Sequence, residues 1–377
     1  MDSRLRRARF SVSAIFLIHG LIVAAWVSRI PAVQAALGLS KSALGSALLA
    51  IAAGSMISMP VAGWLTGKYG SKKTTLVATL AFCASLILPG VAPNLFLLAA
   101  ALVCYGAGAG AMDVAMNVQG VEVETAYGRP VMSSFHALFS LGGMLGSAAG
   151  GLIAAAGIHP ALHFSIAAAA LAIAAVVVSP GMLDHVHAEE HPSMPSFRIS
   201  RSVLILSLLA FCLLLNEGAM ADWSSVYLRS SLKTSEAVAA YGYAVFSATM
   251  AIGRLVGDRL TVRFGRVEMV RYGALVAAAG LGTALLLGTI AATLLGFAAV
   301  GFGFAAIIPL VFGAAGRVEG QSAGSGLATV TTIGYLGFLI GPPLIGYAAD
   351  LLSLRIALGL VVVLSVAGAL LAPSVRR

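Results

Sequence analysis

The sequence predicts an all-α integral membrane protein with twelve transmembrane helices, arranged as two pseudo-symmetric six-helix bundles with both termini in the cytoplasm. Three observations predict this fold class: the composition, the lengths of the apolar segments and an internal repeat. Of the 377 residues, 59% are hydrophobic and only 10% are charged, whereas a typical soluble chain has about 25% charged residues. So little polar surface cannot cover a soluble core of this size, and the apolar surface must therefore face lipid.

The apolar segments have the length that a membrane helix needs. A helix crosses the bilayer core with about 20 residues, and short polar or Gly/Pro-containing breaks divide the chain into such segments. The expected spans are residues 10–30, 42–63, 74–91, 95–119, 132–157, 160–180, 202–226, 237–258, 269–288, 291–316, 324–349 and 354–373. The first of them is longer than the roughly 7 to 15 apolar residues of a signal peptide, so we interpret it as a retained helix.

The position of the one long polar stretch defines the expected domains. We predict an N-terminal bundle at 1–183, a cytoplasmic linker at 184–201 and a C-terminal bundle at 202–377. The linker contains three histidines, which makes a metal site conceivable. A charged, Pro-containing connector between two bundles explains the same composition without a ligand, so we expect no metal and no cofactor.

The distribution of basic residues predicts the orientation. Of the 23 Lys and Arg residues, 18 fall on the side of the termini and 5 on the opposite side, and the cytoplasmic side of a membrane protein carries the excess. The net charge of +9 does not predict a nucleic-acid partner, because these residues lie between apolar segments rather than on one basic face.

An internal repeat appears when the two halves are compared at an offset of 195 to 197 residues. Residues 63–70 align with residues 258–265, sharing a Leu-Thr pair, a basic residue, an aromatic residue and a glycine, and Trp26 aligns with Trp223. The near-constant offset of these matches indicates a duplication.

Two six-helix repeats of the same orientation are the arrangement of major facilitator transporters, which this sequence resembles. The loop after the second span is similar to the superfamily signature Gly-x3-Asp-Arg-x-Gly-Arg-Lys. The residues that match it, to which the resemblance assigns a gating role, are Gly63, Lys68, Gly70, Lys72 and Lys73. The acidic residue of the signature is replaced by Gly67, and the second copy has Val262 at that position.

Residues 110–120 and 133–143 show a closer resemblance, to a poorly characterised bacterial branch related to fucose/proton symporters. The resemblance implies a secondary transporter of the inner membrane rather than an enzyme. The substrate does not carry over, because the acid that sugar symporters have in the first helix has no equivalent here.

Three carboxylates lie inside the expected spans rather than at their ends: Asp113, Glu217 and Asp222. A charged group inside a membrane helix costs several kcal/mol unless it faces water or a partner, so each is a candidate functional residue. Asp113 shares a helix face with Asn117 and two glycines, although a structural hydrogen-bond clamp would use the same face. We expect Asp113 and Glu217 to carry the coupling proton.

Polar and aromatic residues near the middle of the spans are candidates for binding the solute. These are His19, Asn117, Asn216, Trp26 and His136. Trp26 could instead anchor its helix at the membrane interface, and His19 could simply pair with Glu217. Arg29 and Asp222 are candidates for an ion pair that gates the outer side.

These observations predict a transporter that moves a small solute by alternating access, with proton symport of a polar nutrient favoured and proton-driven efflux of an amphipathic compound as the alternative. A channel or a membrane enzyme is less well supported, because the sequence contains no repeated pore segment and no dense catalytic set. The expected partners are the solute, protons and membrane lipid, and we expect a monomer.

Overall fold

The computed structural model describes residues 3–184, 200–318 and 323–376, and these residues are almost entirely helical. Eleven of its helical segments are long and apolar enough to cross a membrane, which agrees with the predicted all-α membrane fold. The other long helix, α9 (Glu236–Phe264), is less apolar because four charged residues lie in its last three turns. The predicted linker with its histidines falls almost wholly outside the described residues.

The first half of the chain forms seven α-helices. They are α1 (Ser3–Ala36), α2 (Lys41–Tyr69), α3 (Ser71–Leu86), α4 (Leu88–Val91), α5 (Leu95–Tyr127), α6 (Met132–Ala155) and α7 (Pro160–Val178), followed by the 3-10 turn η1 (Ser179–Gly181).

In the second half, α8 (Arg201–Val226) continues into the π-helical turn η2 (Tyr227–Ser231) and is followed by α9. The remaining elements are α10 (Arg266–Leu287), α11 (Ile290–Phe304), α12 (Ile307–Ala315), α13 (Ala323–Leu351), α14 (Leu354–Ala357), α15 (Gly359–Leu371) and the 3-10 turn η3 (Ala372–Arg376).

Side-chain caps explain where several helices begin. Ser40, Asn94, Ser200, Ser235 and Thr289 each precede a helix, and each side-chain oxygen accepts a hydrogen bond from the backbone N–H three residues later. Such caps satisfy donors that have no partner within the helix.

Prolines interrupt two of the spans that the sequence predicted as single helices. Pro309 lies in the first turn of α12, where its missing N–H and its ring prevent a continuous helix from Phe304 onward. Pro89 in α4 has the same effect after α3. Pro342 and Pro343, in contrast, lie inside α13, which continues through both.

The predicted repeat is visible in the turns that follow the second helix of each half. Gly70 between α2 and α3 has φ +89°, and Gly265 between α9 and α10 has φ +91°. Each donates its N–H to a threonine carbonyl, from Gly70 to Thr66 and from Gly265 to Thr261, at 2.9 Å. Glycine is favoured at both positions because other residues rarely adopt a positive φ.

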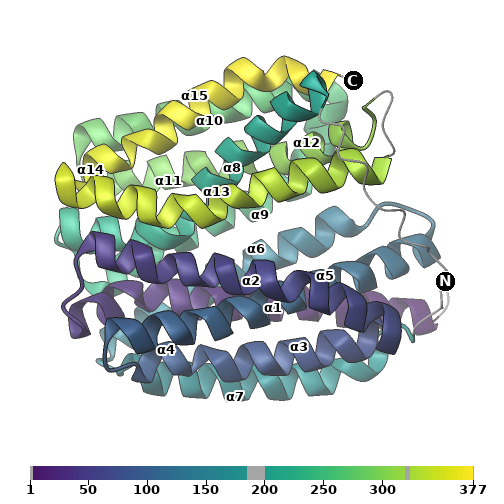
Figure 1. Ribbon diagram of the computed structural model, residues 1–377, viewed down its shortest axis with the longest axis horizontal. Coiled ribbons are helices and arrows are strands. Elements are labelled where there is room, and N and C mark those ends of the chain that lie inside the picture. The colour runs from purple at the N-terminus through teal and green to yellow at the C-terminus, as the bar shows by residue number, and fades with distance from the viewer. Residues whose placement is uncertain (1–2, 185–199, 319–322, 377) are drawn as a thin grey trace.

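Figure 1 shows α1–α7 in the lower part of the molecule and α8–α15 in the upper part, with both chain ends on the same side. We call this side the terminus end, and the side with the α1–α2, α6–α7, α8–α9 and α13–α14 turns the far end. The halves meet mainly where α2 packs on α13 and α6 packs on α9.

Glycines bring helix backbones together both within and between the halves. A Cβ atom on Gly106 of α5 would overlap the carbonyl of Ile51 on α2. Between the halves, a Cβ on Gly143 of α6 would lie 2.8 Å from Ser247 Oγ on α9. Small residues at such crossings are typical of membrane helices, whose association depends on close packing.

Candidate functional site

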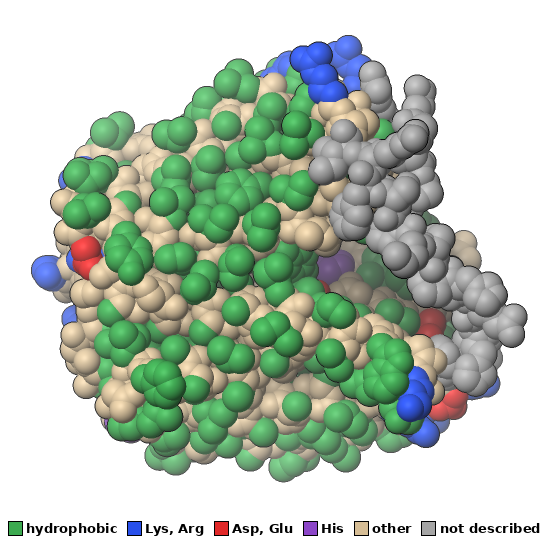
Figure 2. All heavy atoms as spheres, viewed as in Figure 1, with side chains coloured by type: hydrophobic (Ala, Val, Ile, Leu, Met, Phe, Trp, Pro, Cys, Tyr) green, Lys and Arg blue, Asp and Glu red, His purple; other side chains and the backbone are tan. Residues whose placement is uncertain are grey.

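Two adjoining cavities lie between the halves of the molecule. The larger, of about 680 Å³, extends toward the terminus end, and the smaller, of about 270 Å³, lies further toward the far end. Both are lined by His19, Asp113, Tyr335 and Phe338. Figure 2 shows the surface hollowed between the two halves, with a histidine side chain visible in the hollow.

Asp113 of α5 lies where the two cavities meet. Its carboxylate accepts a hydrogen bond of 3.1 Å from Asn117 Nδ2, one helical turn further along. The hydroxyl of Tyr335 on α13 lies within electrostatic reach of this carboxylate. Asp113 of the first half and Tyr335 of the second half both line the two cavities, and Asn117 lines the larger one.

Glu217 of α8 pairs with Arg254 of α9, with 3.6 Å between Oε1 and Nη2. Arg254 Nη1 also donates to the His136 carbonyl at 3.1 Å and to Ser140 Oγ at 2.7 Å, both on α6. The guanidinium therefore joins the second predicted proton-coupling residue to the other half of the molecule. Since Arg has five donors in a planar fork, it suits such a bridge.

Of the predicted solute-binding residues, His19, His136 and Trp26 line the cavities. The His19 ring packs edge-on against Phe82 and Phe139, with centroid distances of 5.5 and 5.2 Å. Trp26 is 1% exposed, so it is a cavity wall rather than an interface anchor.

The prediction that Asn216 faces the solute is wrong. Its side chain is fully buried, and Nδ2 donates to Ser365 Oγ on α15 at 3.2 Å. Because α8 turns by 100° per residue, Glu217 points into the cavity while its neighbour Asn216 packs between helices.

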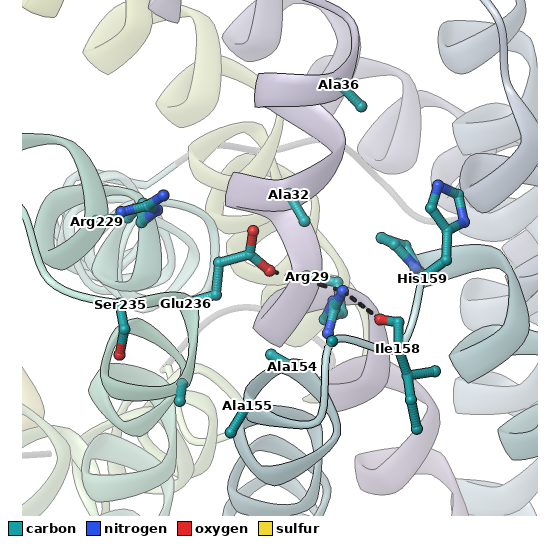
Figure 3. A pocket seen from close by; sticks show the side chains of 13 residues that line it. Arg29, Ala32, Ala36, Ala154, Ala155, Ile158, His159, Arg229, Ser235 and Glu236 are labelled. Atoms are coloured by element: carbon teal, nitrogen blue, oxygen red, sulfur yellow. Dashed lines mark hydrogen bonds and ion pairs between the residues drawn. The ribbon is translucent and has the colours of Figure 1, made fainter.

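The expected pairing of Arg29 with Asp222 is also wrong. Arg29 Nη2 lies 3.6 Å from Glu236 Oε2 at the start of α9 and donates to the Ile158 carbonyl at 2.8 Å (Figure 3). This contact closes the far end, beside a pocket lined by Arg229 and His159 as well. Asp222 instead lines the smaller central cavity.

The residues that match the signature loop lie at the terminus end, away from the cavities. Lys72 donates to Asp184 Oδ1 at 2.9 Å, and this bond lowers the pKa of the Asp184 carboxyl. Lys68 lies over the rings of Trp64 and Tyr69, at 4.8 and 5.2 Å.

The remaining residues that match the signature loop are Lys73, Gly63 and Gly70. The Lys73 side chain is exposed, Gly63 has no atom within 4 Å of a Cβ built on it, and Gly70 forms the turn described above.

The sequence did not predict two residues of the site, Arg254 and Tyr335. Arg254 lies inside the predicted span 237–258, and a basic residue within a span is as much a functional candidate as an acidic one. Tyr335 carried no signal of its own, because a tyrosine in an apolar helix is unremarkable without knowledge of the face it presents.

Comparison with known proteins agrees with this architecture. The family model of the Major Facilitator Superfamily matches residues 12–318 and 206–377. The chain belongs to the Major Facilitator Superfamily. It is 39% identical to an uncharacterised MFS-type transporter of Yersinia pestis, covering 96% of this chain and 94% of the relative. It is 34% identical to the uncharacterised transporter y4wD of Sinorhizobium fredii strain NBRC 101917 / NGR234, covering 97% of each.

The fold of this Major Facilitator Superfamily protein is similar to that of a bacterial homologue of the human lysosomal transporter Spinster, solved in an inward-facing, unoccupied conformation. The TM-score is 0.76 at 15% identity, over 100% of this chain and 98% of the other. The family assignment confirms the prediction of a transporter rather than an enzyme, and the bacterial relatives confirm a multi-pass protein of the inner membrane.

Proposed function

We propose that this protein is a proton-coupled secondary transporter that moves a small solute by alternating access. The observation that carries the proposal is the position of Asp113, a carboxylate inside a membrane helix that lines both cavities and lies within electrostatic reach of Tyr335 in the other half. A proton arriving at Asp113 removes the charge that interacts with Tyr335, so protonation and the interaction between the halves depend on each other.

The second proton site is Glu217, whose carboxylate lines the larger cavity and pairs with Arg254, which in turn contacts α6. Protonation of Glu217 would remove one charge of this pair and leave Arg254 with only neutral acceptors. A buried charge without its partner is costly, so this step also changes the relative stability of the two access states.

Three further features complete the proposal. The helix α9 is the twelfth span, its charged residues lying toward the terminus end. The terminus end is cytoplasmic, as the 18 to 5 split of basic residues favours. The two bundles, joined by the linker 184–201, move relative to each other about the central cavity.

The test uses protein reconstituted in liposomes with an imposed pH gradient. Screening candidate solutes for uptake should identify one whose flux is accompanied by proton movement, and Asp113→Asn should abolish gradient-driven accumulation. Asp184→Asn, an exposed carboxylate outside the cavities, is the matched control. Accumulation by Asp113→Asn at the wild-type level would remove Asp113 from proton coupling, and solute-independent ionic current of channel size would overturn the carrier.

A further inference from the structure

The central cavities carry an excess of negative charge. Their lining includes four carboxylates, Asp113, Glu217, Asp222 and Asp258, and one guanidinium, Arg254, so the formal balance is 1 − 4 = −3 with the histidines neutral. No Lys or Arg is among the described residues that line the smaller cavity. Since Arg254 already contacts Glu217 and α6, an anionic solute would find no free counter-charge here.

Asp222 is the carboxylate that most needs a partner. It lines the smaller cavity, and no described residue donates a hydrogen bond to it or forms an ion pair with it. Tyr105 and Tyr243 lie within electrostatic reach of it, but both are neutral phenols. A membrane-embedded carboxylate is costly unless it is neutralised, so its position calls for a proton or a cationic ligand.

Two buried ring nitrogens on α1 also lack partners among the described residues. His19 is 6% exposed and Trp26 is 1% exposed, and neither His19 Nδ1 nor Trp26 Nε1 makes a hydrogen bond. Both residues line the smaller cavity. Buried polar atoms are normally satisfied, so the unpartnered His19 Nδ1 independently indicates that something polar occupies the space. In one tautomer, His19 Nδ1 accepts a hydrogen bond, which the N–H of a protonated amine can donate. Trp26 Nε1 is a donor only, so Trp26 contributes its ring face to a cation rather than its N–H.

Aromatic rings form the walls around these groups. The rings of Trp26 and Tyr105 lie 6.2 Å apart, and those of Tyr335 and Phe338 lie 5.7 Å apart. All four residues line the smaller cavity. Aromatic faces attract cations, most strongly where water is excluded. A volume of about 270 Å³ is near the lower limit for a ligand site, and it suits a small molecule.

From these observations we propose that the solute is a small organic cation, an amine or a quaternary ammonium ion, held by Asp222 and Asp113 within the aromatic walls of the smaller cavity. This inference rests on the proposed transport function, because it names the substrate class of the same site. A neutral polyol would leave Asp222 without a counter-charge, and an anion would be repelled. The cationic class is therefore the one that satisfies the charges.

The same geometry favours antiport, in which the cation is exchanged for protons, rather than symport. A proton and the cation neutralise the same carboxylates, so each displaces the other. Several other titratable and charged groups surround Asp222 and Asp113. They are His19 on α1, Tyr105 on α5, His136 on α6, Glu217 on α8, Tyr243, Arg254 and Asp258 on α9, and Tyr335 on α13.

The test measures ligand binding to the purified full-length protein by quenching of intrinsic tryptophan fluorescence, because Trp26 lines the cavity. The probes are benzyltrimethylammonium, its neutral analogue benzyl alcohol and the anion benzoate, which share one ring and differ in charge. We expect saturable binding of the cation that is at least about tenfold tighter than that of either analogue. Equal or tighter binding of benzyl alcohol or benzoate would overturn the proposal.

Two variants locate the site. Asp222→Asn should weaken binding of the cation by about tenfold or more, whereas Asp184→Asn, at an exposed carboxylate outside both cavities, should change it by less than about threefold. A weaker effect at Asp222 than at Asp184 would contradict the assignment. If Asp222→Asn does not fold, the charge preference of the wild-type protein still decides the substrate class.

Binding and transport separate the two proposals. Cation binding without proton-coupled flux in liposomes would refute the proposed function and leave the ligand class intact. Proton-coupled flux of neutral or anionic solutes without cation binding would refute only the ligand class.

Discussion

Asp350 at the end of α13 caps the first turn of α2 in the other half of the molecule. Its Oδ2 accepts a hydrogen bond of 2.8 Å from the backbone N–H of Ser42, and its Oδ1 accepts one of 3.2 Å from that of Lys41. The first N–H groups of a helix have no internal partner, and the helix dipole favours a negative charge there. Asp350 of the second half thus binds the start of α2 in the first half, and this contact closes the far end.

We therefore predict that Asp350→Asn weakens closure of the far end. A charge at a helix N-terminus contributes about 0.3–1 kcal/mol, so the population open at the far end should rise by about twofold to fivefold. Distances between spin labels at Ala35 and Ser231, in a background without the three native cysteines, would measure this shift. Asp184→Asn, at the terminus end, serves as control, and an unchanged distance distribution in Asp350→Asn would refute the capping role.

The two side chains of the Arg29–Glu236 pair differ in burial, and this difference leads to a prediction. The Arg29 side chain is 4% exposed and that of Glu236 is 34% exposed. Glu236→Gln removes the negative charge beside Arg29 and leaves the buried guanidinium with the Ile158 carbonyl as its partner among the described residues. We expect this variant to lose more folding free energy than the loss of an exposed pair costs, which is about 0–1 kcal/mol.

Adding Arg29→Gln to Glu236→Gln should recover part of this loss, because the double variant buries no charge. Thermal unfolding of the two single variants and the double variant would test the coupling. Strictly additive losses would show that the two side chains do not interact.

Two glycines on the packed helices α2 and α5 should respond oppositely to alanine. Gly106→Ala would push a methyl group into the carbonyl of Ile51, and overpacking of this kind costs about 1–3 kcal/mol. Gly63→Ala meets open space and exchanges glycine for a better helix former, worth up to about 1 kcal/mol. Melting temperatures should fall for the first and stay level or rise for the second, and the reverse order would contradict the α2–α5 packing.

Arg254→Lys should impair transport more than stability. Lysine keeps the charge but cannot reach Glu217, the His136 carbonyl and Ser140 Oγ together, because its single ammonium replaces a planar fork. We expect at least a tenfold slower flux, with the protein still folded by thermal unfolding. Arg259→Lys, at an exposed position of the same helix, is the matched control. Normal flux in Arg254→Lys would show that the bridge between the halves is dispensable.

Part of the candidate site could be predicted from the sequence because a charge within an apolar helix is a local signal. Asp113, Glu217 and Asp222 were found this way, and all three line the central cavities. Asn216 was misplaced because sequence gives the helix but not its rotation about its own axis. The sequence predicts the wrong partner for Arg29 because the actual partner, Glu236, lies 207 residues away in the sequence (236 − 29). Only the packing of α1 against α9 brings the two side chains together.

The sequence by itself determined that this protein crosses the membrane many times, because the length and apolarity of each helix are properties of contiguous residues. It also determined the internal repeat, which is seen again in the matching turns at Gly70 and Gly265. Only the tertiary structure decided which polar groups meet, such as Glu217 with Arg254 and Arg29 with Glu236. Those contacts depend on helix rotation and on the packing of the two halves, which no local pattern specifies.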